Sequence, residues 1–380
     1  MRGRRSTSRM GETIMSRTFL RGALVGALFI AICTIAICST ALPGAASPDE
    51  GKSLVLLPPP ANAAAGGPCD RACLNGFVDK YFDALISHCA CGIALAPGIK
   101  YTENGQIVTP GEGIWKTFTG RGNYRVYLAD PATGQAGYYG DFHEFKGTLR
   151  GVMALRLKVQ DRQITEVEMI AVREQLRPAG GLGANTAGIM TPRMIDELQS
   201  KDFIVPDATL LEPLPATGRT SREQLIAASD RYFDGFTQNK GAIVPFAEQC
   251  SRRENGIAAT NNSAGPVVDP ALPAFRVFSQ GCAQELDRGF FSALSRARDR
   301  RPLVVDEDQG LVLELALFDN EGNVKSVSVP GAGNVVVPSE FLRPITYVEP
   351  QLFKIESGKI RAIEGLSWPV PYGMKSGWNQ

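Results

Sequence analysis

The chain has 380 residues, a hydrophobic content of 44%, a charged content of 21% and a formal net charge of +1. This length accommodates two domains of ordinary size, and the composition is that of a globular protein. A net charge so close to zero provides no long-range field that would attract nucleic acid or acidic lipid. Stripes of basic and aromatic residues typical of nucleic-acid-binding surfaces are also missing from the sequence. We therefore expect no nucleic-acid partner.

Residues 1–46 have the order of a secretory signal peptide. Several arginines precede an apolar run from Gly22 to Leu42, and small residues follow at 43–46. The apolar run is long for a signal peptide, so an uncleaved membrane anchor is the alternative, and only then do we expect a membrane partner. Residues 47–68, rich in proline and then in alanine and glycine, have the composition of a flexible linker. The sequence predicts export to the periplasm or the cell exterior.

Six cysteines follow the leader, and an even number in an exported chain favours disulfides over catalytic thiols. Cys250 and Cys282 are the two cysteines of the second half of the chain, and we expect them to pair. Pairing in the first half stays open. Cys69 and Cys73 could bridge at a helix start, or either could reach Cys89 or Cys91 if the chain folds back.

Two short sequences recur at a single offset. Asp79-Lys-Tyr-Phe-Asp83 reappears as Asp230-Arg-Tyr-Phe-Asp234, and Glu103-Asn-Gly105 reappears as Glu254-Asn-Gly256, each 151 positions later. Self-similarity at a fixed offset indicates a duplicated structural unit.

The repeat predicts a first domain at 69–177, a connector at 178–220 and a second domain at 221–380. The second domain is longer, and we expect its extra residues at 258–280 and 330–344.

Hydrophobic periodicity predicts the same element order in both domains. A helix at 74–88 comes first, then a hairpin turning at Asn104-Gly105, a short helix at 112–118 and four antiparallel strands. In the second domain, a capping box at Thr220-Ser-Arg-Glu223 starts the first helix, and residues 280–297 have a helical pattern. We expect an α+β fold of two tandem cone-shaped domains, each a curved antiparallel sheet wrapped around helices.

The order of elements, together with four sequence words, resembles the SnoaL-like, nuclear transport factor 2-like superfamily, and in particular a set of exported proteins of unassigned function. These words are Cys69-Asp-Arg-Ala-Cys-Leu74, Tyr81-Phe-Asp83, Leu95-Ala-Pro97 and Tyr101-Thr-Glu-Asn-Gly105. The resemblance covers about 69–175 and 221–370. It implies a cone with a pocket at its open end. The superfamily includes isomerases, dehydratases, lyases and non-enzymatic binding modules, so the fold alone selects no function.

The strongest candidate for catalysis is His143, in a predicted strand. A period of two places Tyr139, Asp141 and His143 on one face. If that face lines the pocket, it combines a base that titrates near neutral pH, a carboxylate that orients it and a phenol donor. The alternative is a solvated strand with a surface histidine.

Two residues of the first helix are further catalytic candidates, Asp83 and His88. A histidine at a helix C-terminus more often has a structural role. His88 with Cys89 and Cys91 does not have the spacing of a zinc site, so we expect neither a metal nor a cofactor.

Aromatic and charged residues near the predicted pocket are candidates for substrate binding. They are Tyr81, Tyr101, Glu103, Trp115, Tyr124, Tyr232, Asp234, Arg253 and Glu254. The second domain has no histidine, so acid–base chemistry there would need Asp234, Glu254, Glu314 or Glu364, and a carboxylate can serve only if burial raises its pKa.

The sequence therefore predicts an exported, cofactor-independent lyase, dehydratase or isomerase acting on a small apolar or aromatic molecule. The alternative is a non-catalytic small-molecule-binding protein or a structural tandem module. We expect the two domains to pair with each other or the chain to form a homodimer.

Overall fold

The computed structural model describes residues 68–173, 207–262, 279–329, 333–337 and 341–378. The predicted leader, the linker up to residue 67 and most of the connector lie outside this part. Among the described helices, none has both the length and the apolar character needed to cross a bilayer.

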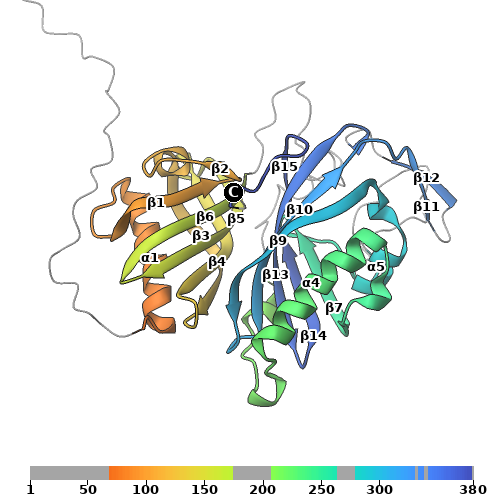
Figure 1. The fold of residues 1–380 in the computed structure, drawn as a ribbon, viewed down its shortest axis with the longest axis horizontal. Coiled ribbons are helices and arrows are strands. Elements are labelled where there is room, and N and C mark those ends of the chain that lie inside the picture. The colour runs from red at the N-terminus through yellow and green to blue at the C-terminus, as the bar shows by residue number, and fades with distance from the viewer. Residues whose placement is uncertain (1–67, 174–206, 263–278, 330–332, 338–340, 379–380) are drawn as a thin grey trace, which may run out of the picture. The chain divides into compact units, whose positions relative to one another are not determined.

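The first sheet follows helix α1 and has the strand order β2-β1-β6-β5-β4-β3. Strand β1 runs parallel to β6, while the other neighbouring strands are antiparallel. Helix α1 packs against β3 and β4 (Figure 1). The elements are α1 (Arg71–Ser87), β1 (Leu95–Glu103), β2 (Gln106–Ile107), η1 (Gly113–Lys116), β3 (Phe118–Asp130), β4 (Gln135–Glu144), η2 (Phe145–Gly147), β5 (Leu149–Gln160) and β6 (Gln163–Arg173).

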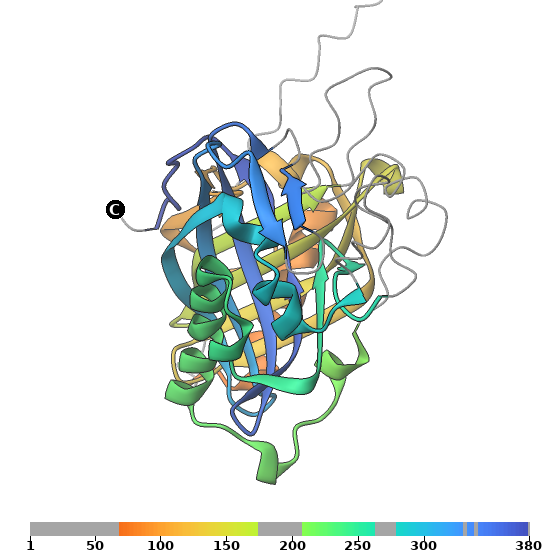
Figure 2. The ribbon, with the colours of Figure 1, turned by 90° about the vertical axis from the view of Figure 1, so that its right-hand side faces the viewer.

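The second sheet has the order β8-β7-β14-β13-β10-β9, and β15 adds to it by pairing with β13. Helix α4 lies along one face of this sheet (Figure 2), while β11 and β12 form a separate hairpin. The elements are α3 (Ala208–Leu211), η3 (Ala216–Gly218), α4 (Arg222–Gln238), η4 (Gly241–Ile243), β7 (Phe246–Glu254), β8 (Ile257–Ala258), α5 (Cys282–Asp287), η6 (Phe290–Ala293), β9 (Leu294–Asp306), β10 (Leu311–Asn320), β11 (Ser326–Val329), β12 (Gly333–Val336), β13 (Ile345–Glu356), β14 (Lys359–Gly365) and β15 (Trp368–Val370).

The two sheets share one strand order, and the spacing of equivalent elements locates the extra residues of the second. Helix α4 starts 151 positions after α1, and β7 and β8 keep that offset from β1 and β2. The offset grows to 176 between β3 and β9, which start at 118 and 294, and to 196 between β5 and β13, which start at 149 and 345. The inserted segments therefore lie between β8 and β9 and between β10 and β13, and the predicted insertions overlap both.

The predicted fold class is wrong. The described residues are mostly strand, and neither large sheet wraps around helices to form a cone. Each sheet is also mixed, because β1 and β7 run parallel to β6 and β14. One face of each sheet carries its helix, whereas the opposite faces contribute to a common apolar cluster that includes Tyr139, Val152, Leu313 and Leu352. All ten residues of β10 are buried, as expected for a strand with both faces covered.

The predicted helix at 280–297 extends too far. Strand β9 begins at Leu294, and its arginines pair with a carboxylate of the neighbouring strand β10. Nε of Arg298 lies 2.8 Å from Oδ2 of Asp319, and Nη2 of Arg296 lies 2.6 Å from the same oxygen. Pairing across the sheet therefore overrides the local helical pattern.

Both long helices begin with a side-chain cap. Asp70 accepts a hydrogen bond from the amide of Cys73 at the start of α1. A capping box opens α4 one residue later than expected, with Ser221 as the cap and Gln224 as its partner. Each helix ends at a residue in the left-handed region, His88 or Asn239.

The repeated Asp-x-Tyr-Phe sequence holds each helix against its sheet. In the first half Arg121 of β3 binds Asp79 at 3.0 Å and lies over the ring of Phe82 at 4.6 Å. In the second half Arg300 of β9 binds Asp230 at 3.1 Å and lies over the ring of Phe233. In each half an arginine contacts both the aspartate and the phenylalanine ring of the repeated sequence. These contacts explain the repeat by structure.

The Asn-Gly repeat forms the turn between the first two strands of each sheet. Asn104 and Asn255 both have positive φ, at 49° and 48°. Each asparagine also bonds a backbone beyond its own hairpin: Asn104 Oδ1 accepts from the amide of Ala171 at 2.8 Å, and Asn255 Oδ1 accepts from the amide of Ser367 at 3.0 Å. Each turn is therefore formed by its own Asn-Gly pair and is also held in place by a hydrogen bond to the backbone of β6 or of the residues just after β14.

Candidate functional site

Strand β4 presents its predicted catalytic face away from α1. Tyr138 packs on Phe82 of α1 with ring centroids 4.7 Å apart, so the even-numbered residues face the helix. Tyr139 instead joins the apolar cluster shared by the two sheets, and its hydroxyl donates to the carbonyl of Gly365 at 3.2 Å.

Asp141 and His143 are the other two residues on the predicted catalytic face of β4. Oδ1 of Asp141 accepts a hydrogen bond from the amide of Tyr124 at 2.9 Å, and burial raises the pKa of this carboxyl. His143 is half-buried. Among the described residues, the hydrogen bonds of Tyr139 and Asp141 go to backbone groups, while the charge of His143 lowers the pKa of the Asp141 carboxyl against the effect of burial.

The first sheet brings together three predicted binding residues on its helix-facing side: Tyr81, Tyr101 and Trp115. The rings of Tyr81 and Trp115 meet edge to face with centroids 5.7 Å apart, and all three side chains are buried. Burial raises the pKa of the Tyr81 and Tyr101 hydroxyls above the ordinary value. Among the described residues, neither hydroxyl nor the indole nitrogen makes a hydrogen bond of normal geometry, but the Tyr81 hydroxyl interacts with both Tyr101 and Trp115. We call these three residues the aromatic cluster.

An ion-pair chain lies next to the aromatic cluster. Arg173 binds Oε1 of Glu103 at 2.7 Å and Oε2 of Glu144 at 2.6 Å. The second oxygen of Glu103 accepts the amide of Ile114, at the start of η1, at 2.9 Å. Glu103 is therefore fully engaged in holding η1 and β6 in place.

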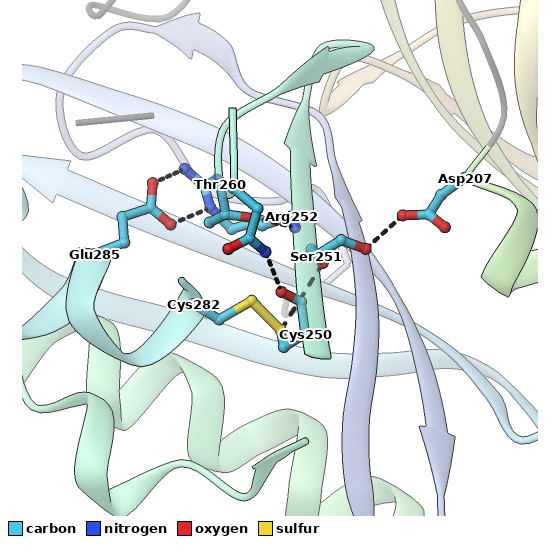
Figure 3. Close-up of a disulfide and its surroundings, with 8 residues drawn as sticks. Asp207, Cys250, Ser251, Arg252, Thr260, Cys282 and Glu285 are labelled. Atoms are coloured by element: carbon cyan, nitrogen blue, oxygen red, sulfur yellow. Dashed lines mark hydrogen bonds and ion pairs between the residues drawn. A yellow bond between two sulfur atoms is a disulfide. The ribbon is translucent and has the colours of Figure 1, made fainter. Parts of the chain in front are cut away.

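The equivalent location in the second sheet is ionic. Tyr232, Arg252 and Glu254 follow Tyr81, Tyr101 and Glu103 by 151 positions. Arg252 forms a two-bond pair with Glu285 of α5, with donor–acceptor distances of 2.8 and 2.6 Å (Figure 3). Its third nitrogen binds Glu254 at 2.8 Å. The disulfide between Cys250 and Cys282 ties α5 to β7 beside this pair, which positions Glu285.

A third carboxyl group of this region belongs to Glu349, on β13. Burial, and then the charge of Glu254, raise the pKa of Glu349 to about 8. Its oxygens accept from Ser367 Oγ at 2.9 Å and from Gln351 Nε2 at 3.2 Å. Gly365 makes room for Gln351, because a Cβ there would come within 2.5 Å of Gln351 Oε1.

The phenol of Tyr232 completes this group. Its hydroxyl is buried without a hydrogen-bond partner among the described residues, and its pKa, raised by burial, is also influenced by Arg252 and Glu349. We call the set the β7–β13 cluster, and it consists of Tyr232, Arg252, Glu254, Glu285, Glu349, Gln351 and Ser367. Glu254 reaches solvent, with 18% of its side chain exposed.

Sequence reasoning found Tyr232 and Glu254 but missed Arg252, Glu285 and Glu349. Arg252 occupies the position of Tyr101 in the repeat, so a charge where the first copy has an aromatic ring was a visible signal. A second visible signal was Glu349, a charged residue inside a mostly apolar strand. Glu285 lies in an insertion without a counterpart in the first half.

The predicted site residues Asp83, His88 and Asp234 lie at or near the surface. Asp83 and His88 are exposed. Nδ1 of His88 lies 2.5 Å from the carbonyl oxygen of Trp115, so the imidazole fastens the end of α1 to η1. Asp234 binds Arg300 at 2.8 Å and belongs to the contact between α4 and β9.

Tyr124 and Arg253 lie with Glu364, away from the β7–β13 cluster. Burial raises the pKa of Glu364 to about 8, and Nε of Arg253 is 3.7 Å from this carboxylate. Glu314 is also buried, with a pKa raised to about 8, and accepts a hydrogen bond from Ser229 of α4. In the part of the chain that the structure describes, no group of three or more His, Cys, Asp or Glu side chains is arranged to hold a metal ion.

Residues 218–367 match a family model described as a domain of unknown function (DUF8021). The match begins just before α4 and ends just after β14, so it contains strands β7 to β14 and the β7–β13 cluster but not β15. No curated protein matches the chain.

Proposed function

We propose that the β7–β13 cluster is an acid–base site at which an exported protein transfers a proton on a small neutral molecule. The activity belongs to the class of lyases, dehydratases or isomerases. Glu349 is the proton donor and acceptor, and Tyr232 donates a hydrogen bond to an oxygen of the substrate. The observation that carries the proposal is a buried carboxyl group and an unpartnered buried phenol in one polar group, inside an otherwise apolar core.

The carboxyl of Glu349 suits this role because its pKa of about 8 is close to a neutral working pH. A general acid and base is most effective when both of its protonation states are accessible at that pH. In water a glutamic acid titrates near 4.3 and would be fully ionised.

The charges around Arg252 favour a neutral substrate. Its guanidinium is already bound by Glu254 and Glu285, which leaves no spare cation for an anionic ligand. A carbonyl or hydroxyl oxygen, in contrast, would supply the acceptor that the Tyr232 hydroxyl lacks. Glu254, at the solvent side, marks where such a molecule would enter.

Hydrogen–deuterium exchange tests the proposal without knowledge of the substrate. We would incubate the protein in D₂O with a panel of neutral aldehydes, ketones and hydroxy-carbonyl compounds and follow deuterium incorporation by mass spectrometry. We expect catalysed exchange on at least one compound, with a loss of at least about 100-fold in Glu349→Gln, the scale of a general acid–base contribution.

Glu314→Gln is the matched control, because Glu314 is an equally buried carboxyl with a similarly raised pKa beside α4. It should leave the exchange unchanged. The proposal fails if no compound exchanges, or if Glu314→Gln and Glu349→Gln lose activity equally.

A non-catalytic binding function has its own supporting observation in the first half. The aromatic cluster offers three buried polar groups that make no hydrogen bond of normal geometry among the described residues. Its neighbouring carboxylates, Glu103 and Glu144, are held by Arg173. Such a site would bind a molecule with acceptor oxygens. Retention of a ligand by the protein that is abolished in Trp115→Phe but not in Glu349→Gln would favour this function.

A further inference from the structure

The three disulfides of the described chain have different structural positions. The Cys69–Cys73 bridge spans the start of α1, and the Cys250–Cys282 bridge joins β7 to α5. The Cys89–Cys91 bridge connects residues only two positions apart, in the segment between the end of α1 and the start of β1. It links no two elements. A disulfide stabilises a fold more when it closes a longer loop, so this bridge is the least useful of the three for stability.

The environment of Cys89 and Cys91 is instead that of a reactive disulfide. Cys91 is exposed and Cys89 is half-buried, whereas both Cys250 and Cys282 are buried. The backbone amide of Cys91 donates a hydrogen bond to Sγ of Cys89 at 3.1 Å. A donor directed at this sulfur stabilises it as a thiolate, which makes Cys89 the better leaving group and the exposed Cys91 the sulfur open to attack.

We propose that Cys89–Cys91 is a redox-active disulfide that oxidises dithiols in exported peptides or proteins. A substrate thiolate attacks Sγ of Cys91, the bond between the two cysteine sulfurs breaks, and Cys89 leaves as a thiolate. The second substrate thiolate then attacks the substrate sulfur of this mixed disulfide and releases Cys91 as a thiolate. The substrate loses two electrons and gains a disulfide, its two thiol protons pass to Cys89 and Cys91, and a small-molecule disulfide such as glutathione disulfide restores the bridge.

A redox titration of the full exported chain tests the first part of this proposal. The protein is equilibrated over a series of reduced-to-oxidised glutathione ratios, free thiols are alkylated, and mass spectrometry reports each cysteine pair separately. We expect Cys89 and Cys91 to be alkylated at ratios that leave Cys250–Cys282 fully oxidised. Reduction of all three pairs together, or of Cys89–Cys91 last, would overturn the proposal.

Turnover tests the second part. With glutathione disulfide present, the protein should accelerate oxidation of a reduced dithiol peptide at least about tenfold over the Cys89→Ser/Cys91→Ser variant. Cys89→Ser alone keeps the exposed sulfur as a thiol, and its thiolate should attack the peptide sulfur of a single-cysteine peptide supplied as a mixed disulfide with glutathione. Glutathione leaves as the thiolate, and the peptide stays bound to Cys91 as a mixed disulfide because neither a Cys89 thiol nor a second peptide thiol remains to displace it. Cys91→Ser should trap much less. Equal rates for the native chain and the double variant, or equal trapping by the single variants, would contradict it. Glu349→Gln should not alter this activity, which separates it from the acid–base site.

Discussion

Arg71, at the start of α1, binds Asp306, at the end of β9, through two hydrogen bonds of 2.6 Å each. The equivalent residues form the reverse pair: Arg222, at the start of α4, binds Asp130, at the end of β3, at 2.7 Å. The helix of each half is thus fastened to a strand of the other. This exchange is the pattern of an isologous contact, in which residue i meets j and j meets i, and it supports the proposal that the two halves pair within one chain.

Loss of the Arg71–Asp306 pair should destabilise the protein. Asp306 is fully buried and also accepts the amide of Ala129 at 2.9 Å, so Arg71→Ala leaves a buried carboxylate without its cation. We expect the free energy of unfolding, measured by urea denaturation, to fall by about 2–4 kcal/mol. Lys116→Ala removes an exposed partner of Glu112 and should change it by less than about 1 kcal/mol. Equal effects of the two substitutions would show that the buried pair contributes no more than a surface pair.

The disulfides should differ in their contribution to stability as their loops differ in length. Cys250 and Cys282 are 32 positions apart, and replacing both by serine should cost about 3–4 kcal/mol in the chain-entropy model. Cys69 and Cys73 are four positions apart, and the same model gives about 2 kcal/mol for their removal. Thermal and urea unfolding of both double variants check the order, and a larger loss from the Cys69/Cys73 variant would contradict it.

Much of this architecture could be predicted from local patterns. The bounds of α1 and α4, the Asn-Gly turns and the pairing of Cys250 with Cys282 follow from spacing over a few residues or from simple cysteine counting. These features depend on short-range chemistry, and the chain realises them with shifts of a few residues.

What could not be predicted depends on which face of each strand is covered. A period of two groups Tyr139 with Asp141 and His143 but does not say whether they face α1 or the other sheet. Here they face away from α1. From local sequence alone, Arg252 would be expected to be exposed. It is buried because α5, which lies in an insertion, places Glu285 beside it. Long-range packing therefore determined the candidate site.

The raised pKa of Glu314 predicts a specific dependence of stability on pH. The folded-state pKa of about 8 exceeds the ordinary 4.5, so the folded protein binds this proton more tightly than the unfolded chain does. Its contribution to stability is therefore fully present below about pH 4.5 and is lost as the pH rises to about 8, by up to about 1.4 kcal/mol per pH unit.

Glu314→Gln removes that contribution, so its unfolding free energy should fall less than that of the native chain between pH 5 and pH 8. Urea unfolding at several pH values measures the difference. Parallel pH profiles for the two proteins would mean that Glu314 is ionised in the fold.

The Arg252–Glu285 pair should show strong coupling. Both side chains are almost fully buried, at 2% and 1% exposure. Arg252→Met leaves the buried Glu285 carboxylate without its cation and should cost about 3–5 kcal/mol. Glu285→Leu leaves Arg252 with Glu254 as its carboxylate partner and should cost less. The double variant leaves neither charge of this pair, and its loss should be well below the sum of the single losses, by at least about 2 kcal/mol in a double-mutant cycle from urea unfolding. Arg253 follows Arg252 in the sequence, but its side chain is 24% exposed and its Nε lies 3.7 Å from Oε1 of Glu364. Arg253→Met is therefore a control that should show little coupling to Glu285. Additive losses for Arg252 and Glu285 would show that the guanidinium and the carboxylate do not depend on each other, and Glu285 would then have no role in holding Arg252 beside Tyr232 and Glu349.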